Sequence, residues 1–161
     1  MILGIDPGAS GAIAWMEEDG SLIAIEDMPS IKVKVGKGMR TRVSAAMLAG
    51  LIRIRPPTMA YVEKVGAMPG QGTASMFAFG YSAGLVEGVL AGLGIPVTHV
   101  TPQSWKASSR IPAAKGAARM RAGQLFPGHA GAFARVKDDG RAEAALIALY
   151  GYQARHGVAA A

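Results

Sequence analysis

Apolar residues in the first 28 positions come in short runs separated by polar turns, a pattern typical of β-strands. Asp19-Gly20 is a strong signal for a two-residue hairpin, and the Pro-Gly pair after Asp6 marks an earlier turn. The opening of the chain therefore predicts an antiparallel meander of three strands, at Ile2–Asp6, Gly11–Met16 and Ser21–Met28.

Beyond this meander, longer helical stretches alternate with short strands. Ser44 is placed to cap a helix that runs to about Arg53, because apolar residues follow it at helical spacing. Two further apolar runs predict strands, at Thr58–Val62, directly before Glu63, and at Ile95–Val100. Further helices are predicted at Thr73–Leu93, at Ala113–Phe126 and from Asp139 or Gly140 to about Arg155.

Three segments carry weaker signals. Ile31–Arg42 mixes apolar residues with Lys and Gly, and we expect a mobile basic loop with at most one strand, at Ile31–Val35. Thr101–Arg110 is expected to be a polar, basic connection, and Pro127–Gly131 is expected to break the helix before it.

The order of these elements predicts the fold class. An antiparallel meander that continues into parallel strands through helical crossovers gives an α/β domain with a five-stranded mixed sheet flanked by helices. A length of 161 residues is typical of one domain. We expect a single domain over residues 1–157 and a disordered tail at 158–161.

Composition excludes several classes of protein. Half of the residues are hydrophobic and 17% are charged, so intrinsic disorder is not expected. The absence of cysteine excludes disulfides, thiol chemistry and cysteine-ligated zinc. The longest apolar stretch, Thr73–Gly94, is rich in Gly and Ala and contains Glu87, so we expect no membrane span. The N-terminus lacks the basic region of a signal peptide.

The charge distribution favours a polyanionic partner. Seventeen Lys and Arg against eleven Asp and Glu give a net charge of +6. All the basic residues follow position 31, where only five acids accompany them. Such an excess is typical of a protein that binds nucleic acid, although a soluble basic protein without this partner has the same balance.

Four acids stand in apolar surroundings. Asp6 and Glu63 each end an apolar strand, and Asp139 and Glu143 share a face of the last predicted helix, with Asp138 adjoining. A buried carboxylate is costly unless it is paired or binds a cation. A cluster with only oxygen ligands fits Mg²⁺ or Mn²⁺, and two such ions about 4 Å apart hydrolyse phosphodiesters. The alternative is that each acid caps a helix, pairs with a base or is solvated.

The segment Asp6-Pro7-Gly8-Ala9-Ser10-Gly11 admits a second interpretation. A strand, an acid and a Gly-rich turn also resemble the phosphate-binding hairpin of actin-like and sugar-kinase ATPases. Those ATPases need two such domains, whereas this chain has the length of one, and it contains no GxxxxGK[ST] motif.

Four motifs in order, GIDPGASGAIAW, AYVEKV, TPQSWK and KDDGRAEAALIALYG, resemble a RuvC-type Holliday-junction resolvase of the compact form found in phages. The resemblance covers Met1 to about Tyr150. It implies an RNase H-like nuclease domain, a homodimer, two Mg²⁺ ions per site with Mn²⁺ able to substitute, and paired nicking of four-way DNA junctions. It also implies a cytoplasmic location, in a bacterial or phage-infected cell.

The resemblance assigns roles to particular residues. Asp6 and Glu63 are the first and second catalytic acids, and Asp139 and Glu143 fall in the C-terminal acidic motif. In the bacterial pattern two acids three residues apart begin this helix, whereas here position 140 is Gly, so Asp138 remains a reserve candidate for the ligand. The loop after Glu63 also lacks the aromatic residue of the bacterial enzymes, and Met68 is a candidate apolar wedge in its place.

Basic residues near these motifs are candidate phosphate ligands, or else a solvated face; they are Lys64, Lys106, Lys115, Arg119 and Arg121. Trp105 is suited either to stacking or to core packing. A second strip faces DNA or keeps a loop soluble, and it comprises Lys32, Lys34, Lys37, Arg40 and Arg42. The long helix has too many apolar faces for one buried side, which favours a dimer interface around Met76, Phe77, Phe79, Tyr81 and Leu85.

Three other functions remain open. One is a branched-DNA-binding module of the same fold that does not cleave. The second is an RNase H-like nuclease that acts on RNA, and the third is an ATPase fragment.

Overall fold

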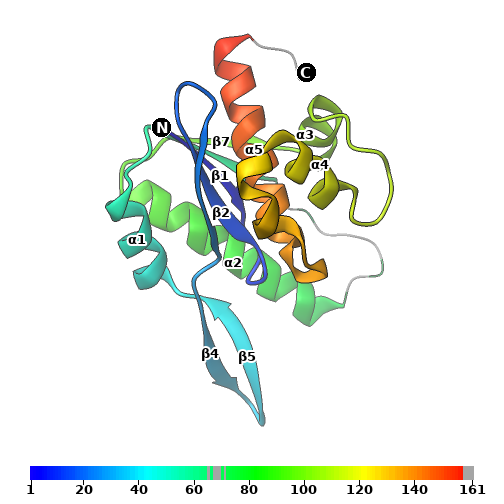
Figure 1. The fold of residues 1–161 in the computed structure, drawn as a ribbon. Helices are drawn as coiled ribbons and strands as arrows, with labels where there is room; N and C mark the ends of the chain where they lie inside the picture. Colours follow the sequence, from blue (N-terminus) through cyan, green and yellow to red (C-terminus); the bar gives the residue numbers. More distant parts are fainter. Residues whose placement is uncertain (65, 67–69, 71, 158–161) are drawn as a thin grey trace.

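The computed structural model describes residues 1–64, 66, 70 and 72–157 (Figure 1). Its main sheet has five strands in the order β3-β2-β1-β6-β7. β1 pairs antiparallel with β2 and parallel with β6, and β6 pairs parallel with β7, so the sheet is mixed as predicted. The strands are β1 Ile2–Asp6, β2 Ala12–Met16, β3 Leu22–Asp27, β6 Met59–Glu63 and β7 Val97–Val100.

Helices cover both faces of this sheet (Figure 1). They are α1 Ala45–Ile54, α2 Thr73–Gly92, α3 Pro102–Ser108, α4 Ala117–Leu125 and α5 Asp139–His156. The predicted cap of α1 is present, since the Ser44 hydroxyl accepts a hydrogen bond from the Met47 N–H at 3.4 Å. The expected α/β fold class, with a five-stranded mixed sheet between helices, is confirmed.

Alternation along the strands divides the core in two. Leu3, Ile5 and Ile13 point to the side covered by α1 and α2. Ile2, Ala12 and the small residues of α5 form the core on the other side, together with Phe126 and Phe133. The strand residues of even number in β1 and of odd number in β6 therefore face α5, and these are the series that end in Asp6 and Glu63.

The structure corrects the prediction for residues 31–42. The segment is a β-hairpin of two strands, β4 Ser30–Val35 and β5 Gly38–Val43, which pair with each other in a separate sheet and project from the body (Figure 1). Its basic residues stand at every second position of each strand, which is a strand pattern. Gly36 takes a positive φ of 60° in the turn between the strands. The strand expected at Ile31–Val35 is present as β4, whereas the loop expected after it is the strand β5.

Three further expectations need correction. The connection expected at Thr101–Arg110 contains α3, which Thr101 caps and Pro102 begins. Helix α4 begins four residues later than predicted, so Lys115 lies in the turn before it, where Gly116 has a positive φ of 77°. Residues Pro127–Phe133 form a 3₁₀-helix, η1, rather than a break, and Val136–Asp138 form a second one, η2. The expected Met68 wedge and the tail at 158–161 lie outside the described residues.

Helix α2 is the longest helix of the described ranges and the only one there with the length and hydropathy of a membrane span. Only 22% of its most apolar window is buried. Its buried side, which includes Val86 and Leu90, packs in the core beside β1 and β6. Glu87 of its exposed side lies 2.8 Å from the Nε2 atom of His99. A large part of this apolar helix is therefore left uncovered within one chain.

Helix α5 lies unusually close to β1, and a glycine makes this approach possible. A Cβ atom built on Gly4 would overlap the backbone of Ala144 and Ala148. Ala144, Ala145 and Ala148 are all fully buried, so the interface consists of small residues on both sides. The distance between α5 and the sheet is thus set by Gly4.

We predict that Gly4→Ala lowers the free energy of unfolding by at least about 1–3 kcal/mol, because the added methyl group displaces α5 from β1. Gly50→Ala is the matched control. It sits in α1 with nothing within 4 Å of its Cβ position, and it is expected to stabilise the protein by roughly 0.5–1 kcal/mol through helix propensity. Urea unfolding of both variants measures the difference, and equal effects would contradict the account of the α5–β1 contact.

Candidate metal centre

Two carboxylates meet at the end of neighbouring parallel strands. β1 and β6 pair in register from Ile2 opposite Met59 to Ile5 opposite Val62, so Asp6 and Glu63, the next residues, end their strands side by side. Both belong to the series that faces α5. The sheet alone therefore places two acids on one face at one edge.

A third carboxylate comes from α5. Glu143 lies one turn into this helix, and Gly140, before it, packs against the turn that follows Asp6. A Cβ on Gly140 would lie 2.8 Å from the Cα of Gly11 and from the carbonyl oxygen of Ser10. A side chain at position 140 therefore has no room, so the acid that the bacterial motif has three residues before its last one does not fit here.

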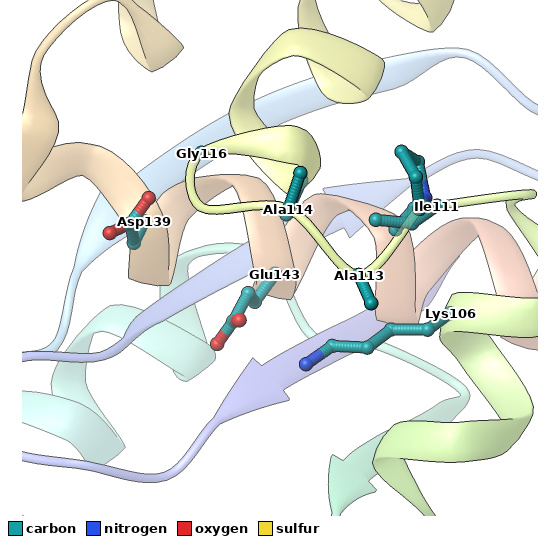
Figure 2. A pocket seen from close by; sticks show the side chains of 9 residues that line it. Lys106, Ile111, Ala113, Ala114, Gly116, Asp139 and Glu143 are labelled. Carbon is teal, nitrogen blue, oxygen red and sulfur yellow. The ribbon is translucent and has the colours of Figure 1, made fainter.

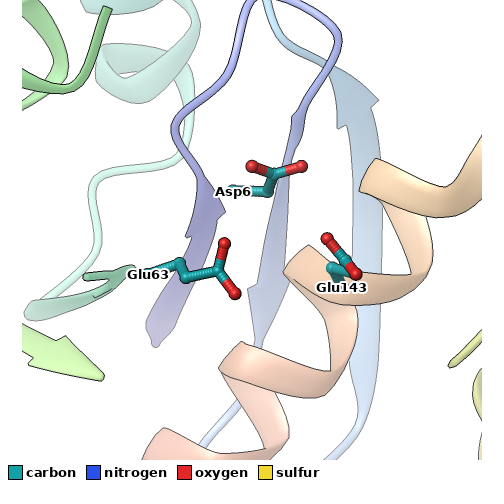
Figure 3. A group of neighbouring side chains, drawn as sticks. All are labelled: Asp6, Glu63 and Glu143. Carbon is teal, nitrogen blue, oxygen red and sulfur yellow. The ribbon is translucent and has the colours of Figure 1, made fainter. Parts of the chain in front are cut away.

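Asp6, Glu63 and Glu143 form a compact group (Figure 3). One carboxylate oxygen from each lies within 4.8 Å of the others. Three elements far apart in the sequence, β1, β6 and α5, supply these side chains. All three side chains are partly buried, and in Figure 3 they point toward a common space.

The pKa values of all three carboxyl groups are raised in this arrangement. Burial, with the charge of Glu63 added, raises the pKa of Asp6 from 3.8 to about 6. Burial and the charges of Asp6 and Glu63 raise the pKa of Glu143 from 4.5 to about 7. Burial also raises the pKa of Glu63, against a hydrogen bond from Trp105 and the charge of Lys106. The cluster therefore resists full ionisation without a cation.

The donor set fits a hard divalent cation. All ligand atoms in the group are carboxylate oxygens, which Mg²⁺ and Mn²⁺ prefer. Two neutral donors fix the ligands: the Gly8 N–H donates to Asp6 Oδ1 at 3.3 Å, and the Trp105 indole N–H donates to Glu63 Oε1 at 3.0 Å. Hydrogen bonds of this kind orient the carboxylates that bind a metal, and the two N–H groups do not themselves bind the ion.

Asp139 and Asp138 stand outside this group. Asp139 shares the face of Glu143 but is half exposed, and its Oδ1 lies 2.6 Å from Arg119 Nε of α4. Asp138 is buried, and it accepts hydrogen bonds from the backbone N–H and guanidinium of Arg135. That pairing keeps the pKa of Asp138 below its usual range. The structure thus brings together three of the four predicted acids.

A pocket of about 500 Å³ adjoins the carboxylates (Figure 2). It lies between α5 and the segment that joins α3 to α4, and both Asp139 and Glu143 line it. Lys106 of α3 lines it as well, with its ammonium group directed toward Glu143 in Figure 2. A phosphodiester backbone that entered this pocket would meet Lys106 and the carboxylate cluster together.

The other predicted basic residues lie around this region. Lys64 directly follows Glu63 and is exposed, and Lys115 is exposed in the turn before α4. Arg121 donates its Nε–H to the carbonyl oxygen of Ser109 at 2.9 Å, which ties α4 to the end of α3. Arg119 is the residue paired with Asp139. The structure leaves Lys64, Lys106 and Lys115 exposed, while both arginines have protein partners.

Sequence reasoning missed two contacts of this site. The indole of Trp105 hydrogen-bonds Glu63, and Arg119 pairs with Asp139. The signal for the first was present, because Thr101-Pro102 is a helix start, with a cap and a proline at the first position, and it places Trp105 one turn into a helix. The second contact joins residues that are 20 positions apart in the chain, and no local sequence pattern indicates it.

Comparison with known proteins agrees with this architecture. No family model matches the chain. It is 34% identical over 119 residues to the chloroplastic Holliday junction resolvase MOC1 of Chlamydomonas reinhardtii, a match that covers 70% of this chain and 14% of that protein. The chain thus spans only a small part of this relative. The resemblance to junction resolvases predicted from the sequence is confirmed.

Solved structures share the fold. Thermus thermophilus RuvC in complex with a Holliday junction substrate matches with a TM-score of 0.59 and 17% identity, over 99% of this chain and 97% of that one. The yeast mitochondrial Holliday junction resolvase Ydc2 matches with a TM-score of 0.52 and 19% identity, over 96% of this chain and 79% of that one. The chain has the RuvC fold, of the RNase H-like kind that was expected.

We predict that the metal-free protein loses stability as the pH rises from 4.5 to 8. The pKa values of Asp6 and Glu143 are higher in the fold than in the unfolded chain, at about 6 and about 7. The stability they contribute is therefore full at low pH, where they are protonated, and is lost as the pH passes these values. Urea unfolding in a chelator measures the decline.

The double variant Asp6→Asn, Glu143→Gln is the control for this decline. It removes both titrating groups, so its stability is expected to vary less with pH over this range, and Mg²⁺ at pH 8 is expected to stabilise the wild type more than the variant. The range avoids lower pH, where protonation of Asp27 and Asp138 would weaken their ion pairs with Arg141 and Arg135. Identical pH profiles for the two proteins would contradict the assignment.

Proposed function

We propose that this chain is a metal-dependent endonuclease that resolves four-way DNA junctions by paired nicks. The observation that carries the proposal is the group of three carboxylates at one edge of a RuvC fold. The basic character of the chain, with a net charge of +6, suits a DNA substrate. The similarity to a resolvase supports the junction as the particular DNA structure.

Asp6, Glu63 and Glu143 would hold two Mg²⁺ ions, with Mn²⁺ able to replace them. Bound there, the ions would supply activation of a water molecule and stabilisation of the leaving oxygen in phosphodiester hydrolysis. The three carboxylates must be ionised to bind them, and Asp6 and Glu143 release their protons near pH 6 and 7. The hydrogen bonds from Gly8 and Trp105 would keep the carboxylates of Asp6 and Glu63 oriented toward the ions.

Asp139 is our proposed fourth ligand. It lies one turn before Glu143 on the same face, and its charge contributes to the raised pKa of Glu143. Its present partner, Arg119, is a residue that a DNA phosphate would attract. A phosphate that binds Arg119 would free Asp139 for the metal. The ion pair of the buried Asp138 carboxylate with Arg135 argues against Asp138 in this role.

Basic side chains around the pocket are proposed to grip the DNA backbone; they are Lys64, Lys106, Lys115, Arg119 and Arg121. As charges beside the carboxylate cluster they would hold phosphates on either side of the cut. The β4–β5 hairpin carries a second basic strip, which we propose also faces DNA. Alternating Lys and Arg along its two strands put several positive charges on an exposed ribbon.

Paired nicks require two active sites, and we propose that a homodimer supplies them. Helix α2 offers the surface, because Phe77 is 70% exposed and Tyr81 45% exposed on an apolar helix. An isologous contact through this helix would bring in a second site by symmetry. We further propose that the protein acts in the cytoplasm of a bacterial or phage-infected cell.

We predict that Asp6→Asn, Glu63→Gln and Glu143→Gln each lower nicking of a synthetic four-way junction in Mg²⁺ by roughly a thousand-fold or more, because each removes an anionic ligand. Junction binding should be kept or tightened, since a negative charge near the phosphates is lost. Glu17→Gln is the control, as Glu17 follows β2 at the opposite end of the sheet. Gel assays of nicking and of binding measure both effects.

Two aspartate variants test the fourth ligand in the same assay. Asp139→Asn is expected to lower nicking with little effect on stability. Asp138→Asn is expected to lower stability by about 1–2 kcal/mol, because it weakens the hydrogen bonds that the carboxylate accepts from the exposed Arg135. Normal nicking by Asp139→Asn would remove Asp139 from the site, and normal nicking by Asp6→Asn would overturn the whole assignment.

The same assay separates the alternatives. Tight binding without nicking in Mg²⁺ or Mn²⁺ identifies a branched-DNA-binding module. Duplex DNA, single-stranded DNA and RNA in parallel reactions separate a junction enzyme from a nuclease of another substrate class. We expect cleavage of the junction, with two symmetric nicks.

We predict that Lys106→Ala and Lys115→Ala each weaken junction binding and reduce the log–log slope of affinity against salt by roughly one unit, as loss of one phosphate contact does. Lys115→Ala is expected to reduce single-turnover cleavage as well. Arg53→Ala is the control, because Arg53 is exposed on α1, which covers the opposite face of the sheet. Affinities and slopes equal to those of Arg53→Ala would place both lysines on a merely solvated surface.

A further inference from the structure

We infer that Trp105 is a positioning residue of the metal centre: its buried indole N–H fixes the carboxylate of Glu63 in the orientation that binds the ion. The inference rests on the proposed role of Glu63 as a ligand. Trp105 is fully buried, and its Nε1 lies 3.0 Å from Glu63 Oε1. The indole therefore has a specific acceptor, beyond the packing of its ring.

The path of the chain makes this contact rigid. Glu63 pairs with Val100 across the parallel strands β6 and β7, and the Lys64 N–H donates to the Val100 carbonyl oxygen at 2.7 Å. The chain then turns at Thr101, whose hydroxyl accepts from the Ser104 N–H and caps α3. Trp105 stands one turn into α3, so the strand that adjoins Glu63 also delivers the donor to it.

The chemistry of an indole suits this role. Its N–H donates one hydrogen bond, accepts none and carries no charge. It therefore holds one oxygen of Glu63 without binding the metal in its place. The carboxylate still points toward Asp6 and Glu143 (Figure 3). A lysine at position 105 would form a salt bridge instead, and would oppose a cation in the same space.

The neighbouring residue strengthens the arrangement. The Lys106 ammonium lies 5.1 Å from the centre of the Trp105 ring, within cation–π distance. The same short helix thus provides a neutral hydrogen-bond donor to Glu63 and a cation to the pocket, which Lys106 and Glu143 both line. Ligand orientation and phosphate attraction are thereby built from two consecutive residues.

The chain contains a matched pair for a test. Trp15, its other tryptophan, is also fully buried, and its indole donates to the carbonyl oxygen of Arg55 at 3.0 Å. A cation lies over its ring as well, with Arg55 at 5.9 Å. Its acceptor is a backbone carbonyl at the C-terminal end of α1, on the other side of the sheet. The two tryptophans differ chiefly in the acceptor they serve.

The test compares Trp105→Phe with Trp15→Phe in the full chain without DNA. Mn²⁺ binding is measured by electron paramagnetic resonance at pH 8, with urea unfolding alongside. We expect Trp105→Phe to weaken Mn²⁺ binding by about 10-fold or more, the usual effect of losing a partner behind a metal ligand, and Trp15→Phe to leave it within about 2-fold. Both should lose stability. Equal Mn²⁺ affinity in the two variants would overturn the inference.

A second measurement uses the wild type, so it does not depend on either variant folding. The two indole N–H groups give two resonances in a ¹⁵N correlation spectrum, and Mg²⁺ is added to saturation. We expect the Trp105 resonance to shift and that of Trp15 to stay, and we expect Glu63→Gln to abolish the shift. Saturable Mg²⁺ binding that moves neither indole would overturn the inference.

These outcomes are distinguishable from failure of the proposed function. Normal Mn²⁺ binding by the wild type without nicking of any junction would contradict the endonuclease and leave the role of Trp105 standing. Mn²⁺ binding that Glu63→Gln does not weaken would contradict the metal centre, and the role of Trp105 with it.

Discussion

The site depends on how closely α5 packs against β1. Asp6 and Glu63 are brought together by strand pairing alone, but Glu143 reaches them only because Gly4 and the alanines of α5 let the helix lie against the sheet. Gly140 makes a second close approach, to the turn after Asp6. A larger side chain at either glycine would separate the third carboxylate from the other two. Glycine and alanine residues, which have no reactive side chains, thus determine the position of the third carboxylate.

The acids around the site fall into two groups, those in ion pairs with arginine and those in the carboxylate cluster. Near the start of α5, Arg141 pairs with Asp27, Arg135 with Asp138 and Arg119 with Asp139. In the described part of the chain, none of the three clustered carboxylates is in an ion pair, although Lys106 lowers the pKa of two of them. These three partly buried acids repel one another, and a divalent cation bound among them would relieve that repulsion.

The sequence predicted the sheet and the strand-end acids because both follow from local pattern: apolar runs with period two, each ending in an acid. It also placed Glu143 on the right helix. A strand at Ile31–Val35 was expected, but its partner β5 was missed because the alternating polar positions there are arginine rather than neutral residues. The partners of Asp139 and Glu63 were missed because they lie 20 and 42 residues away in the chain, where only the tertiary fold brings them near.

Diffraction from crystals soaked in Mn²⁺, collected at a wavelength where manganese scatters anomalously, would locate the bound ions. We expect anomalous density in contact with the carboxylates of Asp6, Glu63 and Glu143, with α5 still packed on Gly4. Manganese bound at saturation elsewhere, with no density among these three side chains, would contradict this expectation.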